Sequence, residues 1–287
     1  MRGPGRDEVL LPARLAWRRL WLRRGIPATD LLAGGSALVV APHPDDETIG
    51  CGVTILRKRD AGHRVDIAIV SDGALAEPAI GSPAEMAALR AVEATRACAR
   101  LGVTAEHLHQ LAFPDGGLAE RADAVTERLA ELVTRLRPDF LLVPVSCEGH
   151  PDHDATNRAA RAAAARAGYV GRILEYPVWL WTHWPWTDGY GQARGFSARR
   201  FLREPVRRVG ETRPLLVEAA PGYRSRQRAA LAEHASQMDP SGGPRSLPPS
   251  LLSATRSRYE VYLEVGALDH LARPTLPPKP APAAADR

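Results

Sequence analysis

The chain lacks the features of disulfide-bonded secreted proteins and of membrane-spanning proteins. It contains three cysteines, Cys51, Cys98 and Cys147, and their odd number and wide spacing do not suggest a disulfide framework. The apolar stretches are too short and too interrupted to span a bilayer, and no apolar segment with a cleavage site follows the N-terminus. We therefore expect a cytoplasmic protein, and we interpret Cys147 as a small buried thiol.

Aromatic residues and net charge are also low. Aromatic residues make up 6% of the chain, and the formal net charge of +5 at pH 7 is spread over Arg-rich segments. A charge of this size suits an anionic substrate or a lipid surface but does not indicate nucleic-acid binding. No Gly-x-Gly-x-x-Gly pattern follows the first predicted strand, which argues against a dinucleotide-binding protein.

What the chain does have is enough apolar sequence for one large domain. It has 287 residues, of which 45% are hydrophobic. Apolar runs at 37–41, 65–70 and 140–146 read as strands, and helical patterns lie between them. This alternation predicts an α/β protein with a Rossmann-like, mostly parallel sheet and helices on both faces.

The first group of polar residues follows the apolar run 37–41, which predicts a buried strand leading into a loop and then, past Gly50 and Gly52, a helix. Ligands of open parallel sheets bind beyond the carboxyl ends of the strands. The loop carries an imidazole followed by three carboxylates: His43, Asp45, Asp46 and Glu47. Pro42 and Pro44 stiffen the backbone on either side of the imidazole.

A second group repeats this arrangement after the apolar run 140–146. The segment contains Gly149, His150, Pro151, Asp152, His153 and Asp154, and we expect a helix to begin near Ala155. Two strands of one sheet would then present their loops to a common crevice. Two histidines and one carboxylate, with one coordination position left open to water, form the ligand set of a catalytic zinc. Asp45, beside Asp46, is a spare acid that can serve as general base.

The segments APHPDDETIG and GHPDHDATN resemble the two signature motifs of the PIG-L/LmbE-like family of zinc-dependent N-deacetylases. The similarity extends over roughly residues 37–239. It implies zinc ligands at His43, Asp46 and His153, with iron(II) as the alternative metal. It also implies Asp45 as general base, and His150 as the group that stabilises the oxyanion or protonates the leaving amine.

The same resemblance suggests substrate contacts elsewhere. An Arg-x-x-Glu pair of the family is matched by Arg90 and Glu93, and the arginine is implicated in substrate binding. The alternative is a solvated or structurally paired arginine on a helix face. Asp115, in a Pro-Asp-Gly turn, is a candidate for holding a sugar hydroxyl, although this sequence forms a turn in any case. His234 lies in a segment similar to one of the family, and its role is left open.

Some family members carry a tyrosine two residues before the first His of the second motif. This chain has Glu148 there, so a tyrosine-assisted oxyanion role is not transferred. Asp72, after the strand at 65–70, either supports a ligand histidine or caps a turn. His107 and His109 share one face of a strand and are expected to be structural.

Three regions are expected along the chain. Residues 1–34 form a basic amphipathic extension, whose Leu/Trp face packs on the domain or lies on an anionic membrane surface. Residues 35–270 form the deacetylase domain. Residues 271–287 are rich in proline and alanine and are expected to be disordered. The Trp-rich segment 176–186 is either a sugar-stacking platform or core packing; its tryptophans are Trp179, Trp181, Trp184 and Trp186.

The sequence thus predicts a metal-dependent hydrolase that removes an acetyl group from an N-acetylglucosamine-type conjugate, a small-molecule substrate. Two alternatives are an LmbE-like amidohydrolase of another small metabolite and a carbohydrate-binding or scaffold protein without turnover. The presence of both Asp45 and His150 argues against the binding protein, because a module that only binds needs no base beside its metal.

Overall fold

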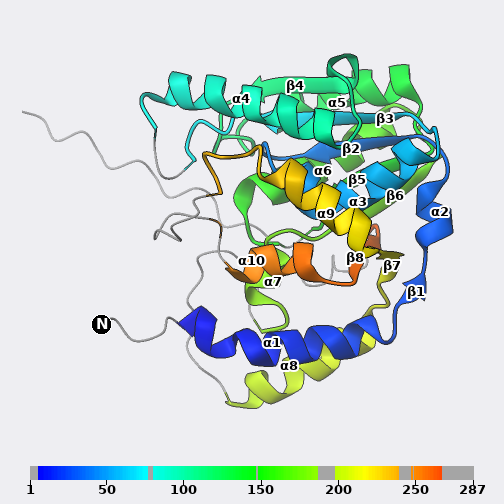
Figure 1. Ribbon diagram of the computed structural model, residues 1–287, viewed down its shortest axis with the longest axis vertical. Coiled ribbons are helices and arrows are strands. Elements are labelled where there is room, and N and C mark those ends of the chain that lie inside the picture. The colour runs from blue at the N-terminus through cyan, green and yellow to red at the C-terminus, as the bar shows by residue number, and fades with distance from the viewer. Residues whose placement is uncertain are drawn as a thin grey trace, which may run out of the picture.

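The computed structural model describes residues 6–76, 80–146, 148–186, 198–238, 247 and 249–266. Cys147 and the tail 271–287, on which two of our predictions fall, lie outside these residues. Within them, eight strands form one sheet in the order β1-β7-β8-β6-β5-β2-β3-β4 (Figure 1). In chain order the strands are Ile26–Pro27 (β1), Ala37–Ala41 (β2), Val65–Ser71 (β3), Leu108–Phe113 (β4), Phe140–Pro144 (β5), Arg172–Tyr176 (β6), Leu215–Glu218 (β7) and Tyr259–Glu264 (β8).

Every neighbouring pair of strands is parallel except the two pairs that involve β8, which runs antiparallel to β6 and β7. The predicted Rossmann-like, mostly parallel sheet is therefore confirmed. The helices are Arg6–Leu22 (α1), Thr29–Ala33 (α2), Asp46–Asp60 (α3), Pro83–Arg100 (α4), Ala122–Leu136 (α5), Pro151–Arg166 (α6), Leu180–His183 (α7), Ala198–Glu211 (α8), Pro221–Leu231 (α9) and Pro249–Leu252 (α10).

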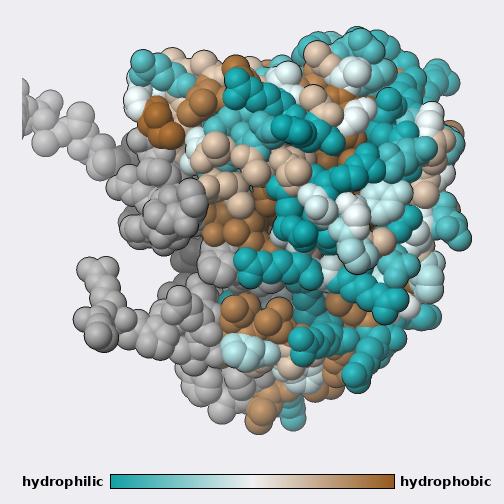
Figure 2. Space-filling model, viewed as in Figure 1, coloured by the Kyte–Doolittle hydropathy of each residue, from teal (hydrophilic) through white to brown (hydrophobic). Residues whose placement is uncertain are grey.

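Helices cover both faces of the sheet because its central strands are apolar on both sides. In β2, Ala37, Val39 and Ala41 pack in a cluster with residues of α3, α4 and α9. Leu38 and Val40, which point the other way, pack with α5 and α6. The outward faces of the covering helices are largely hydrophilic in the view of Figure 2.

The N-terminal helix α1 packs its aromatic face on the domain, beside α8 (Figure 1). Trp21 is fully buried, and its ring centroid lies 4.9 Å from that of Trp184 and 6.0 Å from that of Trp181. Its Nε1 donates a hydrogen bond to the Thr212 carbonyl at 3.1 Å. Of the two alternatives for this segment, the structure has the packed one. No helix in the described part of the chain is long and apolar enough to cross a bilayer.

The second motif starts its helix earlier than the sequence suggested. Helix α6 begins at Pro151, with His150 as N-cap, and not near Ala155. Proline suits the first position of a helix, because its fixed φ is helical and its missing N–H would have no partner there. Asp152 and Asp154 in the first turn favour the same start, since carboxylates stabilise the positive end of the helix dipole. His153 therefore lies on a helix and not in a loop.

Helix α3 also begins early, at Asp46, and contains both glycines of the first motif. A Cβ atom at Gly50 would lie 2.2 Å from Cδ2 of Tyr176, and one at Gly52 would lie 2.7 Å from Cγ of Gln227. Only glycine allows α3 to approach β6 and α9 this closely. Tyr176 cannot easily move aside, because its hydroxyl donates a hydrogen bond to the Val40 carbonyl at 2.8 Å.

Two buried side chains from later in the sequence bind the backbone of α3. Gln227 Nε2 donates to the Thr48 carbonyl at 2.8 Å. The Glu260 carboxylate, on β8, accepts hydrogen bonds from the backbone N–H groups of Val53 and Thr54. These contacts fix the first turns of α3, which carry Asp46 and Glu47.

We predict that Gly50→Ala destabilises the protein by about 1–3 kcal/mol, because the added methyl group overlaps the anchored Tyr176 ring. Differential scanning calorimetry would detect this as a lower Tm. Gly222→Ala, in the first turn of α9, is the matched control, since nothing lies within 4 Å of its Cβ position. Equal Tm values for the two variants would contradict this account of the packing.

Candidate metal centre and catalytic site

The two motifs meet because the strands that precede them are neighbours. β2 pairs with β5 in parallel, with Ala37 opposite Phe140 and Val39 opposite Leu142. Their carboxyl ends therefore lie at the same edge of the sheet, and so do the N-termini of the helices that follow, α3 and α6. Asp46 is the first residue of α3, and His153 lies in the first turn of α6.

Three side chains converge at this edge: His43, Asp46 and His153. The Oδ2 atom of Asp46 lies 3.2 Å from Nδ1 of His43 and 3.2 Å from Nε2 of His153. One potential ligand atom from each residue lies within 4.8 Å of the other two, and all three residues are buried. The backbone N–H of His43 also donates to Asp46 Oδ2 at 3.0 Å, which holds the carboxylate in place.

The donor set suits a metal ion. Two imidazole nitrogens and a carboxylate oxygen are the ligands of catalytic zinc sites that keep an open position. The Nε2 atom of His153 is buried and has no hydrogen-bond partner among the described residues, although it faces the other two ligands. A metal ion bound to this nitrogen would account for its lack of a hydrogen-bond partner.

The outer nitrogens of both histidines face carboxylates. His43 Nε2 lies 3.2 Å from Asp115 Oδ1 and 3.4 Å from Asp152 Oδ2. His153 Nδ1 lies 3.3 Å from Oε1 of Glu148. Carboxylates in this position fix the tautomer and the orientation of ligand histidines and raise their basicity. This role of Asp152 and Glu148 is not predicted from the sequence.

Glu148 connects His153 to the segment that follows β6. It is fully buried, and it accepts backbone N–H groups from Val178 at 3.0 Å and from Leu180 at 2.9 Å. Val178 follows β6 and Leu180 is the first residue of α7, so their approach to Glu148 has no signal in the local sequence.

The contacts among the three residues shift the pKa values of Asp46 and His153. Burial raises the pKa of Asp46, but the neighbouring His153 and His43 lower it more, and the pKa lies well below its ordinary value. Burial lowers the pKa of His153, while Asp46 and Glu148 raise it to about 9. Asp46 thus attracts both histidines.

Asp45 lies beside this centre as the N-cap of α3. It is buried, and its backbone has a φ of 121°, which non-glycine residues rarely adopt. Its Oδ2 accepts a hydrogen bond from Arg90 Nη2 at 3.1 Å. Burial raises the pKa of Asp45 to about 6, although Arg90 acts in the opposite direction. A carboxylate with this pKa is ionised at neutral pH and is more basic than an exposed aspartate.

His150 is the N-cap of α6 and lies beside both ligand histidines. Its ring centroid is 4.8 Å from that of His153 and 5.0 Å from that of His43. Trp179 stacks on it at 5.8 Å with an interplanar angle of 26°. Burial, followed by the neighbouring His153 and His43, lowers the pKa of His150 to about 3.

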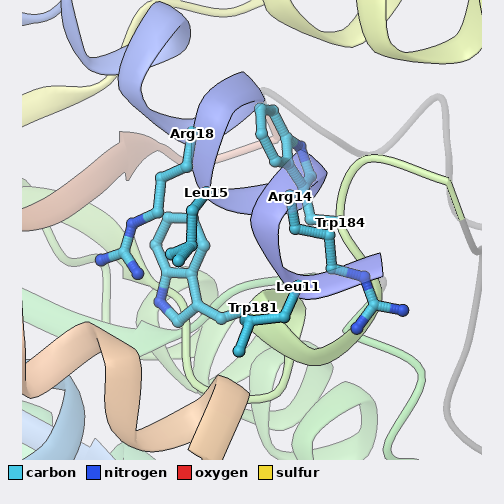
Figure 3. Close-up of a pocket in the computed structure, with 6 residues that line it drawn as sticks. All are labelled: Leu11, Arg14, Leu15, Arg18, Trp181 and Trp184. Carbon is cyan, nitrogen blue, oxygen red and sulfur yellow. The ribbon is translucent and has the colours of Figure 1, made fainter. Parts of the chain in front are cut away.

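The other tryptophans of the segment 176–186 are core residues. Trp181, Trp184 and Trp186 are buried, so a stacking platform built from all four is wrong, and only Trp179 contacts the site. A separate pocket lies between α1 and this segment (Figure 3). Its six lining residues include none of the metal or catalytic candidates: Leu11, Arg14, Leu15, Arg18, Trp181 and Trp184.

The two predicted substrate-binding residues, Arg90 and Asp115, contact Asp45 and His43. Arg90 is buried, and its guanidinium also donates to the backbone carbonyls of Pro44 and Gly73. Asp72 caps a turn, since its Oδ1 accepts the N–H groups of Ala74 and Asp115. It thereby holds Asp115 in the contact with His43 described above. Substrate binding by Arg90 and Asp115 stays a prediction.

His107 and His109 lie outside the site. Each has a ring nitrogen 3.1 Å from Oδ1 of Asp66, which supports the structural role expected for both.

A Rossmann-like sheet with a buried His-Asp-His group and an adjacent carboxylate at its carboxyl edge defines a metal-dependent hydrolase site. Residues 38–164 match the family model described as PIG-L, GlcNAc-PI de-N-acetylase. The chain is also 30% identical over 217 residues to the 1D-myo-inositol 2-acetamido-2-deoxy-α-D-glucopyranoside deacetylase 2 of Catenulispora acidiphila, an alignment that covers 64% of this chain and 69% of that protein. The chain belongs to the PIG-L family of deacetylases.

One further relative and two solved structures are also similar to this chain. Diacetylchitobiose deacetylase of Thermococcus kodakarensis is 34% identical over 120 residues, which covers 40% of this chain and 44% of that protein. Protein TT1542 of Thermus thermophilus has a TM-score of 0.56 at 26% identity, covering 79% of this chain and 93% of that one. The N,N'-diacetylchitobiose deacetylase of Pyrococcus horikoshii shares the fold, with a TM-score of 0.59 at 19% identity, over 93% of this chain and 95% of that one.

We predict that Glu148→Gln weakens metal binding about 10–100-fold, because Oε1 no longer offers a charged acceptor to His153 Nδ1. Isothermal titration calorimetry with zinc would measure the change. Asp66→Asn is the matched control, since this carboxylate also faces histidines but lies outside the site. A zinc Kd for Glu148→Gln equal to that of the wild type would show that Glu148 does not support the ligand.

Proposed function

We propose that this protein is a zinc-dependent N-deacetylase that hydrolyses the acetamide of an N-acetylglucosamine-type conjugate. The observation that carries the proposal is the buried group of His43, Asp46 and His153 with the carboxylate of Asp45 beside it. The names of the relatives in the family support the substrate class. Iron(II) is the alternative metal, because the same ligand set suits both ions.

His43, Asp46 and His153 would hold the metal through Nδ1, Oδ2 and Nε2. When bound, zinc supplies Lewis-acid polarisation of the acetamide carbonyl and of water. Asp152 and Glu148 accept the outer N–H groups of the two histidines, so each imidazole keeps its inward nitrogen available for the metal.

Asp45 acts as the general base. It takes a proton from the attacking water, whose oxygen bonds to the carbonyl carbon, and the proton is passed on to the departing nitrogen as the C–N bond breaks. The products are acetate and a free amine. His150, whose low pKa keeps its ring neutral at pH 7, donates an N–H to the carbonyl oxygen as negative charge develops there.

Arg90 and Asp115 have supporting roles in this proposal. Arg90 binds the side chain of Asp45 and the carbonyl of Pro44, so we assign it to holding the base in position. Asp115, which is partly exposed beside His43, is the residue that we propose for a hydroxyl group of the sugar.

The test is acetate release from a panel of three conjugates, with metal content measured on the same samples. The panel contains 1D-myo-inositol 2-acetamido-2-deoxy-α-D-glucopyranoside, diacetylchitobiose and N-acetyl-α-D-glucosaminyl L-malate. The wild type should hold about one metal ion and release acetate. Asp45→Asn should retain the metal and lose turnover by about 10²–10⁴-fold, because only the general base is removed. His153→Ala should lose both metal and turnover, because a ligand is removed.

Two results would contradict the assignment. Full metal content in His153→Ala would remove that residue from the ligand set. Metal binding by the wild type without acetate release from any conjugate would favour a different amide substrate or a carbohydrate-binding role.

A further inference from the structure

A buried ion pair, formed by Glu47 and His234, lies next to Asp45. His234 Nε2, in the turn after α9, lies 3.3 Å from Oε1 of Glu47. Both side chains are fully buried. Burying a charged pair is expensive and often adds no net stability. An ion pair in this position therefore suggests a role other than stabilising the fold.

Glu47 links His234 to the backbone of the catalytic base. Its second oxygen, Oε2, accepts the backbone N–H of Asp45 at 3.0 Å. Asp45 has the φ of 121° described above, a strained conformation that persists only where the surrounding structure holds it. The Glu47 carboxylate is one of the groups that hold it, and His234 fixes that carboxylate from behind.

The turn that carries His234 is itself anchored to the helix that carries Arg90. Ser236 donates to the Glu93 carboxylate through its N–H at 2.8 Å and through its hydroxyl at 2.6 Å. Glu93 and Arg90 are one turn apart on α4, and Arg90 binds the side chain of Asp45 at 3.1 Å. The base is thus held from two sides, through its backbone by Glu47 and through its side chain by Arg90, and α4 connects both supports.

We propose that His234 is a positioning residue for Asp45, acting through Glu47. This inference rests on the proposed deacetylase function. It separates two tasks within the site: the metal site is built by His43, Asp46 and His153, whereas the direction of the Asp45 carboxylate depends on the pair formed by Glu47 and His234. Loss of His234 should therefore affect turnover and leave metal binding and substrate binding largely intact.

The variants are His234→Gln, whose Nε2 donor reaches about as far as that of histidine, His234→Asn, whose donor falls short, and His234→Leu, which has none. We expect kcat close to the wild-type value for His234→Gln and a fall of up to about 10²-fold for His234→Leu, with KM and metal content little changed. His109→Leu removes a comparable histidine–carboxylate contact outside the site and should leave kcat unchanged. If His234→Leu does not fold, the pair of Gln and Asn decides: the same kcat for both would overturn the proposal.

The double variant His234→Leu/Glu47→Gln tests the path of the effect. If His234 acts through Glu47, the double variant should lose no more kcat than the more impaired single variant. Losses that multiply would show that the two residues act independently and would overturn the proposal.

Crystal structures of the variants test the positioning role independently of deacetylase activity. In a crystal structure of His234→Leu or His234→Asn we expect Asp45 to leave the positive-φ region while His43, Asp46 and His153 stay in place. An unchanged Asp45 in those crystals would overturn the positioning role. If the wild type releases no acetate from any conjugate, the deacetylase proposal fails, and the conformation of Asp45 still decides the role of His234.

Discussion

The pairing of β2 with β5 is the constraint on which the site depends. Backbone hydrogen bonds hold the two strands side by side in parallel, so the segments that follow them leave the sheet at the same edge, about 5 Å apart. His43 and Asp46 come from one segment and His153 from the other. Both segments enter helices whose positive ends face the site, which favours the carboxylates that surround the histidines. The ligand geometry is therefore a consequence of strand order.

Many charges are buried at this edge, and each is compensated by a neighbour. Asp46 lies between two histidines, and Glu148 receives backbone N–H groups as well as an imidazole. Asp152 binds His43 and also accepts the N–H groups of Gly116 and Leu118, at 2.8 Å and 3.2 Å. Carboxylates that are both buried and fully hydrogen-bonded cannot rotate freely. The site is thus prepared before a substrate arrives, which is the main physical requirement for electrostatic catalysis.

The parts of this site that are local in sequence could be predicted, and the distant supports could not. The runs before His43 and His150 indicate strands, and the density of His and Asp after each run indicates a metal site. Helix α6 begins before the predicted start near Ala155, because Pro151 suits the first position of a helix. The contacts of Glu148 with Val178, and of Glu260 with α3, join elements whose adjacency is decided by the whole fold. No spacing in the sequence encodes them.

The position of β8 in the sheet affects the order in which the sheet assembles during synthesis. This strand is near the end of the described chain, yet it lies between β6 and β7 in the sheet. While the chain emerges from a ribosome, β1 and β7 can pair with each other but cannot join the larger part of the sheet until β8 has been synthesised. Glu260, which binds the backbone of α3, arrives with the same strand. The hydrogen bonds that anchor α3, the helix that bears Asp46, to Glu260 can therefore form only after β8 has been synthesised.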